Sequence, residues 1–249
     1  MTVSNSCAVL TVRIYAGFNA SSMLAGLLAL SHYDEKAANH EAQQLFPKIQ
    51  FQIHFGKTSV HGISGYTLHI DCPPEKGARH PSDIEAFYSE APLSESELKI
   101  IRDIWSVLIN AEASVHGTSP AEVHFHEVGR CSNLIAIGLI ARLYSKMAVS
   151  NFVSSPIPVG DASITCAHGA IPYPAPSAFA MMKGIPVRPW KGEGEAVTPT
   201  GLAVLIGLGA HFGAWPEMLI TERETVFCSQ TFDSVPNGAL FILGEPFHD

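Results

Sequence analysis

Charged side chains are scarce in this 249-residue chain. Asp, Glu, Lys and Arg together make up 15% of the residues, while hydrophobic residues make up 47%; a typical soluble domain has about 25% charged residues. Such a chain must bury much of its surface, in one sizeable core or between subunits, and we expect a homo-oligomer. The formal net charge is −8. With no run of Lys or Arg to neutralise phosphates, a nucleic-acid partner is not expected.

Long hydrophobic runs are also missing. The longest stretches of apolar residues and glycine span residues 134–141 and 202–210, well short of the ~20 residues that a membrane-spanning helix needs. Residues 1–5 lack the basic and apolar regions of an export signal. We therefore expect no membrane partner and a cytoplasmic location.

Several motifs of common sites are absent as well. The cysteines are odd in number, widely spaced and without a Cys-x-x-Cys pair, so reduced thiols are expected and not a disulfide framework; they are Cys7, Cys72, Cys131, Cys166 and Cys228. Neither His-Glu-x-x-His nor Gly-x-Ser-x-Gly occurs, which leaves metalloprotease and serine-hydrolase functions without support.

The hydrophobic patterns predict an α/β fold of the mixed α+β kind, with a mixed sheet and flanking helices. We expect one domain over residues 1–249, either as a single unit or as two small lobes. Strands are predicted near residues 8–15, 49–55, 58–70, 121–128, 152–159, 218–228 and 239–243. Helices are predicted to begin near residues 21, 82, 94, 132, 177 and 199, with residues 31–47 as a polar helix or a loop.

The segment at residues 121–129 combines two imidazoles and two carboxylates. Val123 and Phe125 alternate with His124 and His126, so the pattern predicts a short strand with both histidines on one face. Glu127 would then lie near the strand's carboxyl end, where open α/β sheets bind ligands. Imidazole with carboxylate suits Zn, Ni, Cu or Fe. The alternative is an ordinary polar strand end whose histidines bond to backbone carbonyls.

Three other places could bind ligands. Cys166 and His168 have an alternate spacing that could add a thiolate and an imidazole to a metal site. The strand before Ser21 or Ser22 leads into a helix that either serine could cap, and Thr198 could cap another helix. Free amides at helix N-termini bind anions, although ordinary strand–helix connections look the same in sequence.

Four motifs in a fixed order carry a family resemblance. They are Val-His-Phe-His-Glu-Val-Gly at 123–129, Ser-Ser-Pro-Ile-Pro-Val-Gly at 154–160, Cys-Ala-His-Gly-Ala-Ile-Pro-Tyr-Pro-Ala-Pro at 166–176 and Gly-Glu-Ala-Val-Thr-Pro-Thr-Gly at 194–201. In this order the sequence resembles the nickel-insertion proteins of nickel-pincer cofactor biosynthesis, the LarC family. The resemblance covers the family's N-terminal region, without its C-terminal nucleotide-binding region.

The resemblance implies insertion of nickel into pyridinium-3,5-bisthiocarboxylic acid mononucleotide. CTP with Mg²⁺ or Mn²⁺ would be used only if a separate chain supplied the C-terminal region. With Cys166 added from its spacing, the predicted metal ligands are His124, His126, Glu127, Cys166 and His168, and Glu127 is also the predicted catalytic residue. The predicted cofactor-binding residues are Ser21, Ser22, Thr198, Thr200 and Gly201.

The resemblance is incomplete at three acidic positions. Ser22, Ser132 and Ala136 stand where the family usually has aspartates, so a non-catalytic metal-binding or partner subunit is the second hypothesis. A third, an unrelated His-x-His metal hydrolase, is disfavoured because only about 120 residues follow His126, too few to complete a barrel of about 250 residues.

Overall fold

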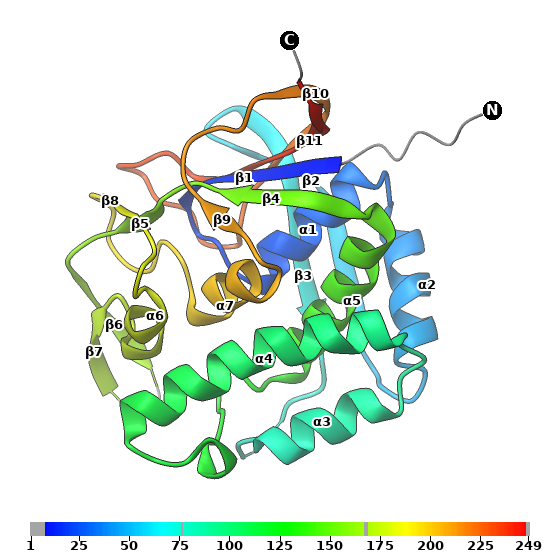
Figure 1. Cartoon of the computed structure of the whole chain (residues 1–249), viewed down its shortest axis with the longest axis vertical. Coiled ribbons are helices and arrows are strands. Elements are labelled where there is room, and N and C mark those ends of the chain that lie inside the picture. The colour runs from blue at the N-terminus through cyan, green and yellow to red at the C-terminus, as the bar shows by residue number, and fades with distance from the viewer. Residues whose placement is uncertain (1–7, 76, 167–168, 248–249) are drawn as a thin grey trace.

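The computed structural model describes residues 8–75, 77–166 and 169–247, and there it contains a seven-stranded mixed sheet with flanking helices (Figure 1). The predicted fold class is confirmed. The strands of this sheet, in spatial order, are β2 (Gln52–Val60), β3 (Ile63–Asp71), β10 (Met218–Val226), β11 (Gly238–Pro246), β1 (Ala8–Ala16), β4 (Val149–Ser154) and β9 (His211–Phe212). Two small sheets join β5 (Ile157–Val159) to β8 (Val187–Pro189) and β6 (Ala162–Cys166) to β7 (Gly169–Tyr173).

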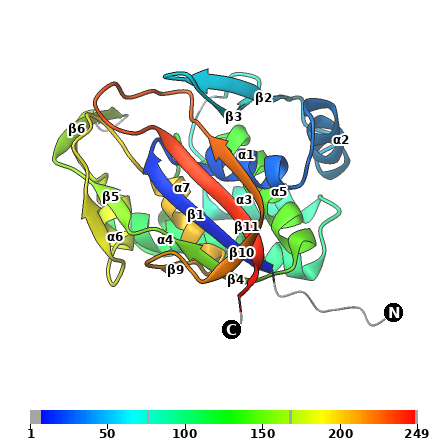
Figure 2. The same ribbon diagram turned by 90° about the horizontal axis from the view of Figure 1, so that it is seen from above.

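The helices lie together on one side of β1 and β4 (Figure 1), and the view from above shows these strands in front of them (Figure 2). The helices are α1 (Ala20–Leu30), α2 (Glu35–Leu45), α3 (Pro81–Ser89), α4 (Glu95–His116), α5 (Cys131–Met147), α6 (Pro176–Met181) and α7 (Pro199–Gly207), with a short 3₁₀ helix, η1 (Pro120–Glu122). None of the helices in the described ranges is long and apolar enough to cross a membrane.

Strand β1 is central because it pairs on both sides, antiparallel with β11 and parallel with β4. Its nearly continuous apolar sequence suits a strand with both faces covered. The chain turns at Gly17, whose φ of 72° favours glycine, and enters α1. The N-cap is Asn19, whose Oδ1 accepts from the Ser22 amide at 2.8 Å. The expectation that Ser21 or Ser22 caps this helix was therefore wrong.

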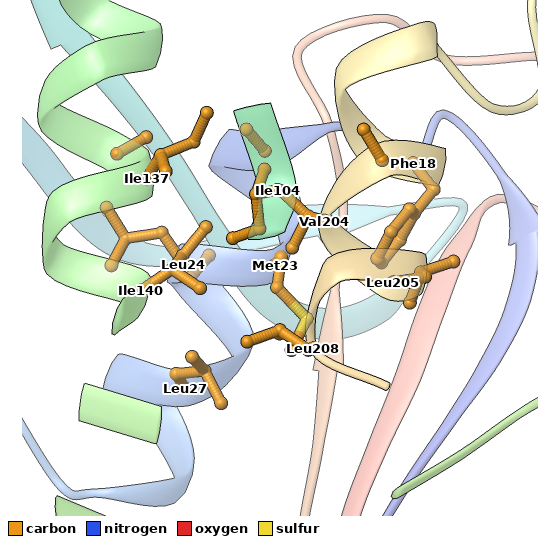
Figure 3. Packing of buried hydrophobic residues seen from close by; sticks show 14 of the residues in the cluster. Phe18, Met23, Leu24, Leu27, Ile104, Ile137, Ile140, Val204, Leu205 and Leu208 are labelled. Atoms are coloured by element: carbon orange, nitrogen blue, oxygen red, sulfur yellow. The ribbon is translucent and has the colours of Figure 1, made fainter. Parts of the chain in front are cut away.

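The main core lies between α1, α4, α5 and α7 (Figure 3). Leu24 of α1, Ile137 of α5 and Val204 of α7 are completely buried there. Gly207 brings α7 close to α4, since a Cβ atom at this position would lie 2.5 Å from Cγ1 of Ile104. This close packing matters for the site because the end of α4 and the start of α7 line the same cleft.

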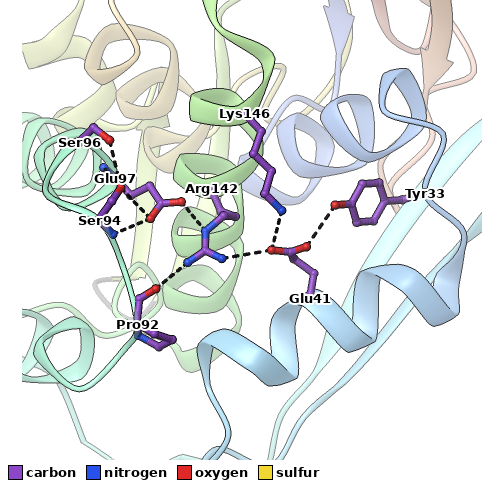
Figure 4. Close-up of polar contacts among 8 residues, drawn as sticks. All are labelled: Tyr33, Glu41, Pro92, Ser94, Ser96, Glu97, Arg142 and Lys146. Atoms are coloured by element: carbon purple, nitrogen blue, oxygen red, sulfur yellow. Dashed lines mark hydrogen bonds and ion pairs between the residues drawn. The ribbon is translucent and has the colours of Figure 1, made fainter.

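A polar network ties α2, α4 and α5 together away from that cleft (Figure 4). Arg142 pairs with Glu97 and Glu41, and Glu41 also accepts from Lys146 at 2.8 Å and from Tyr33 at 3.2 Å. Burial alone would raise the pKa of Glu41, but its bonds to Lys146 and the other partners lower it below the usual value. The network therefore fixes how these three helices are packed.

The segment at 121–128 is the main error of the sequence-based prediction, because it is not a strand. After η1 it forms a loop in which Phe125 alone makes a β-bridge, with Arg79. The alternation of residues is real, yet no neighbouring strand is available, and Phe125 is buried against Trp105 at a ring-centroid distance of 5.7 Å.

Other elements differ at their boundaries. The strand predicted at 152–159 is split into β4 and β5 around Pro156, and the first predicted hairpin strand begins at Gln52. Helix α3 begins at Pro81, with Asp83 accepting from the amide of the N-cap residue His80 at 2.8 Å, so the N-cap precedes Ser82, where this helix was predicted to begin. Helix α7 ends at Gly207, before the predicted end near residue 212.

Candidate functional site

A cleft of about 840 Å³ opens where several segments of the chain meet. They include the N-termini of α1, α5 and α7, the C-terminus of α4, the start of α6, the loop at 124–128 and the loop that carries Glu195. Its polar lining residues include Asn19, Ser21, Glu112, His116, His124, His126, Glu127, Asn133, Ser177, Glu195, Thr198, Thr200 and Gln230.

The cleft lies at the carboxyl end of β1, where α/β sheets bind ligands. Phe18, just after β1, accepts from the Thr198 amide at 3.0 Å and donates its own amide to Ala196 at 2.9 Å. These bonds hold the N-termini of α1 and α7 side by side. A Cβ atom at Gly201 would lie 2.7 Å from the Phe18 carbonyl oxygen, so glycine permits this approach.

Four histidines, called here the histidine cluster, come together from different parts of the chain, and three of them, His116, His124 and His126, line the cleft. His124 is at the centre, with ring-centroid distances of 5.4 Å to His126, 6.3 Å to His80 and 6.4 Å to His116. The sequence pattern predicted His124 and His126 as metal ligands. It did not single out His80 and His116 as site residues, because only the fold brings α3, α4 and the loop together.

Two members of the histidine cluster have defined partners. His80 Nδ1 lies 3.0 Å from the carbonyl oxygen of Val123, and since a carbonyl only accepts, Nδ1 carries the proton. In the neutral ring Nε2 then has the lone pair, as a metal-binding imidazole requires. His116 Nε2 lies 3.5 Å from a carboxylate oxygen of Glu112, one turn earlier on α4.

The predicted metal ligands are only partly described. His124, His126 and Glu127 line the one cleft, but among the described residues no three His, Cys, Asp or Glu side chains are arranged to hold a metal ion directly. Cys166 ends β6, and its side-chain position is not described. His168 lies outside the described residues. This ligand set stays a prediction.

Of the predicted cofactor-binding residues, Ser21, Thr198 and Thr200 line the cleft. Thr198 caps α7 by accepting from the Gly201 amide at 3.1 Å, and its hydroxyl lies 2.9 Å from that of Thr200. Ser22 is buried and donates to the Gly17 carbonyl oxygen at 3.1 Å. Neither Ser22 nor Gly201 is among the lining residues, and the backbone amide of each is already bonded to a capping side chain, that of Ser22 to Asn19 and that of Gly201 to Thr198.

Glu195 is an acidic residue of the cleft that the sequence did not single out. Burial raises its pKa to about 7. Its Oε1 atom is buried and has no hydrogen-bond partner within the described part of the chain. The sequence placed Glu195, unlike Glu193, in the motif at 194–201, but it gave this carboxylate no role of its own.

The 75–79 segment holds the loop that carries His126 and Glu127. Arg79 and Phe125 exchange two backbone hydrogen bonds, of 3.0 and 2.8 Å, and Arg79 Nη1 donates to the Gly129 carbonyl oxygen. Glu75 pairs with Arg79 and accepts from the Cys131 amide at 2.7 Å. Burial opposes the charge on Glu75, but these partners hold its pKa below the usual value.

Comparison with known proteins identifies the family. Residues 10–246 match the family model described as nickel insertion protein. The chain belongs to this family. A putative nickel insertion protein of Geobacter metallireducens is 31% identical over 231 residues, which are 93% of this chain and 59% of the relative. A pyridinium-3,5-bisthiocarboxylic acid mononucleotide nickel insertion protein of Staphylococcus epidermidis is 36% identical over 221 residues, 88% of this chain and 55% of the relative.

This nickel insertion family member thus spans less than two thirds of the length of either relative. No solved structure matches the chain. Ser22, Ser132 and Ala136, where the resemblance led us to expect aspartates, are not among the residues that line the cleft. Ala136 is completely buried in α5 and Ser132 lies in its first turn.

Proposed function

We propose that this protein takes part in inserting nickel into a pyridinium mononucleotide. The metal would bind at the histidine cluster and the nucleotide in the adjoining cleft. The observation that carries the proposal is that one cleft is lined both by members of the histidine cluster and by two helix N-termini. Family membership and the name of the Staphylococcus epidermidis relative support nickel and the bisthiocarboxylic acid mononucleotide as substrates.

The two helix N-termini suit the phosphate of the nucleotide. The capping residues Asn19 and Thr198 both line the cleft, and the free amides and dipoles of helix starts favour an anion. Ser21 and Thr200 would add hydroxyl groups. The volume of about 840 Å³ lies within the range of about 300–1,000 Å³ that is usual for small-molecule sites.

The histidine cluster suits the metal. Imidazole is a good ligand for Ni²⁺, and His80 is already held in the tautomer whose Nε2 can coordinate. His124 and His126 would be the main ligands, joined by Glu127 as ligand and catalytic carboxylate. Cys166 and His168 remain proposed additions, since a soft thiolate would strengthen the binding of a nickel ion.

This sequence corresponds to only part of the longer relatives. We propose that CTP, with Mg²⁺ or Mn²⁺, is used only together with the region of those relatives that this sequence does not cover. This chain would then present nickel and the nucleotide to each other.

Calorimetric titration with Ni²⁺ tests the metal site. The unaltered protein is expected to bind nickel stoichiometrically, and a His124→Ala/His126→Ala variant is expected to lose this binding because it lacks the centre of the histidine cluster. The matched control is His54→Ala/His69→Ala. It removes two exposed histidines, one on β2 and one on β3, that both bond to Asp71. Equal binding by the first variant and the unaltered protein would refute the assignment.

A non-catalytic metal-binding or partner subunit is the second candidate. It is favoured by the lack of a preformed three-ligand group among the described residues and by the missing aspartates. An insertion assay distinguishes the two candidate functions. It contains nickel, the mononucleotide, CTP and the region of a longer relative that this chain does not cover. Formation of the nickel-containing product only when this chain is present would exclude the second candidate.

A further inference from the structure

Glu195 stands out among the lining residues because its charge has no visible counterpart. Its Oε1 atom is buried without a hydrogen-bond partner in the described ranges. A buried carboxylate oxygen without a partner costs free energy, and in a native protein such a group calls for an explanation. Because Glu195 lines the cleft, one explanation is a ligand that pairs with the carboxylate when it binds.

The charges around the cleft define what that ligand would be. Its lining includes the carboxylates of Glu112, Glu127 and Glu195, and no Lys or Arg is among the described residues that line it. Glu112 already faces His116. A positively charged group is therefore the complement of the Glu195 end of the cleft.

The backbone holds Glu195 in place. The next residue, Ala196, is completely buried, donates its amide to the Tyr173 hydroxyl at 3.1 Å and accepts from Phe18 at 2.9 Å. The Tyr173 hydroxyl in turn donates to the Pro158 carbonyl oxygen at 3.2 Å. The backbone next to Glu195 is therefore fixed by two hydrogen bonds of Ala196, which limits the positions that the carboxylate can take and lowers the reordering needed for binding.

Glu195 also lies close in sequence to the proposed phosphate site, three residues before the α7 cap Thr198. A pyridinium mononucleotide carries a cationic ring and an anionic phosphate joined by a ribose. The lining of the cleft includes both an acidic side chain and two helix N-termini, a complement for each of these charges.

We propose, on the basis of the proposed function, that Glu195 is the residue that recognises the positive charge of the pyridinium ring. The carboxylate pairs with the ring while the starts of α1 and α7 hold the phosphate. Glu195 would thereby select nucleotides with a cationic ring over those with a neutral ring. This role needs no nickel.

The raised pKa of Glu195 adds a pH signature. With a pKa of about 7, the carboxyl group is partly protonated near neutrality, and only the charged form pairs with the cation. Binding of a cationic ring is therefore expected to strengthen as pH rises through about 7, whereas binding of a neutral ring should not change for this reason.

Oxidised and reduced nicotinamide mononucleotide form a matched pair of probes, because they share ribose and phosphate and differ in the charge of the ring. Calorimetry without nickel should show tighter binding of the oxidised form. Glu195→Gln is expected to weaken that binding at least about tenfold, as loss of a hydrogen bond or pairing to a charged group does. Binding of the reduced form should be nearly unchanged.

Glu193→Gln is the control, since Glu193 is an exposed carboxylate of the same loop that does not line the cleft. Equal affinity for both probes, equal loss of both in Glu195→Gln, or no binding of the oxidised probe would overturn the inference. So would a Glu195→Gln variant that loses nickel and retains the nucleotide, because Glu195 would then serve the metal. The nickel titration of the histidine variants is independent of these results and tests the proposed function separately.

Discussion

The carboxyl group of Glu195 also links the stability of the fold to pH. Its pKa is raised from 4.5 to about 7 by burial, so between these values the folded protein binds a proton that the unfolded chain releases. The free energy of unfolding should therefore fall as pH rises through this window, by up to roughly 3 kcal/mol, and then level off. Urea unfolding at about pH 5 and about pH 8 measures the fall, which Glu195→Gln should reduce and Glu193→Gln should not.

At the scale of single residues, the sequence predicts site residues well when they lie in one short segment. It predicts them poorly when the fold brings them together from different elements. His124 and His126 could be paired from their spacing, and their rings are indeed neighbours. His80 and His116 lie on other elements, and no local pattern links them to this pair. The cap of α1 was misplaced because Asn19, Ser21 and Ser22 are all good capping residues, and only the backbone decides between them.

Among the elements, α5 depends on a residue far away in the sequence. The side chain of its N-cap residue, Arg130, makes no bond to the first turn. Instead the Glu75 carboxylate accepts from the Cys131 amide.

The strand predicted at 121–128 could not form for a related reason. Its partner is the 75–79 segment, which offers a single β-bridge at Arg79, and alternation in sequence cannot reveal the absence of a neighbouring strand.

Glu75→Ala should therefore weaken both α5 and the loop before it. The change removes a helix-capping acceptor and the partner of Arg79, and it should lower the free energy of unfolding by about 1–2 kcal/mol. Nickel binding should weaken in parallel, since the same contacts hold the loop with His126 and Glu127. Urea unfolding and nickel titration measure the two effects. Glu90→Ala, which removes the partner of exposed Lys48, should change neither, and an unchanged Glu75→Ala variant would contradict the argument.

For the molecule as a whole, the mixed sheet with flanking helices followed from hydrophobic patterns, whereas the cleft depends on tertiary packing. One cluster of buried side chains extends from β1 through α1, α4, α5 and α7 to β11. The resemblance placed three missing aspartates in one neighbourhood. In the structure Ser132 and Ala136 lie about one turn apart on α5, and α1, which carries Ser22, packs against this helix. The two α5 positions differ in burial, since Ala136 belongs to the core while Ser132 lies in the first turn of α5.

Restoring an aspartate should accordingly have opposite results at these two positions. Ala136→Asp would bury a carboxylate in the shared core and should cost several kcal/mol. Because that core is continuous, tryptophan fluorescence and far-UV circular dichroism should lose their native signals in the same urea range. Ser132→Asp adds the same charge at a helix N-terminus and should leave stability equal or slightly higher. A stable Ala136→Asp variant that binds more nickel would show that position 136 contributes to the metal site, contrary to its place in the core.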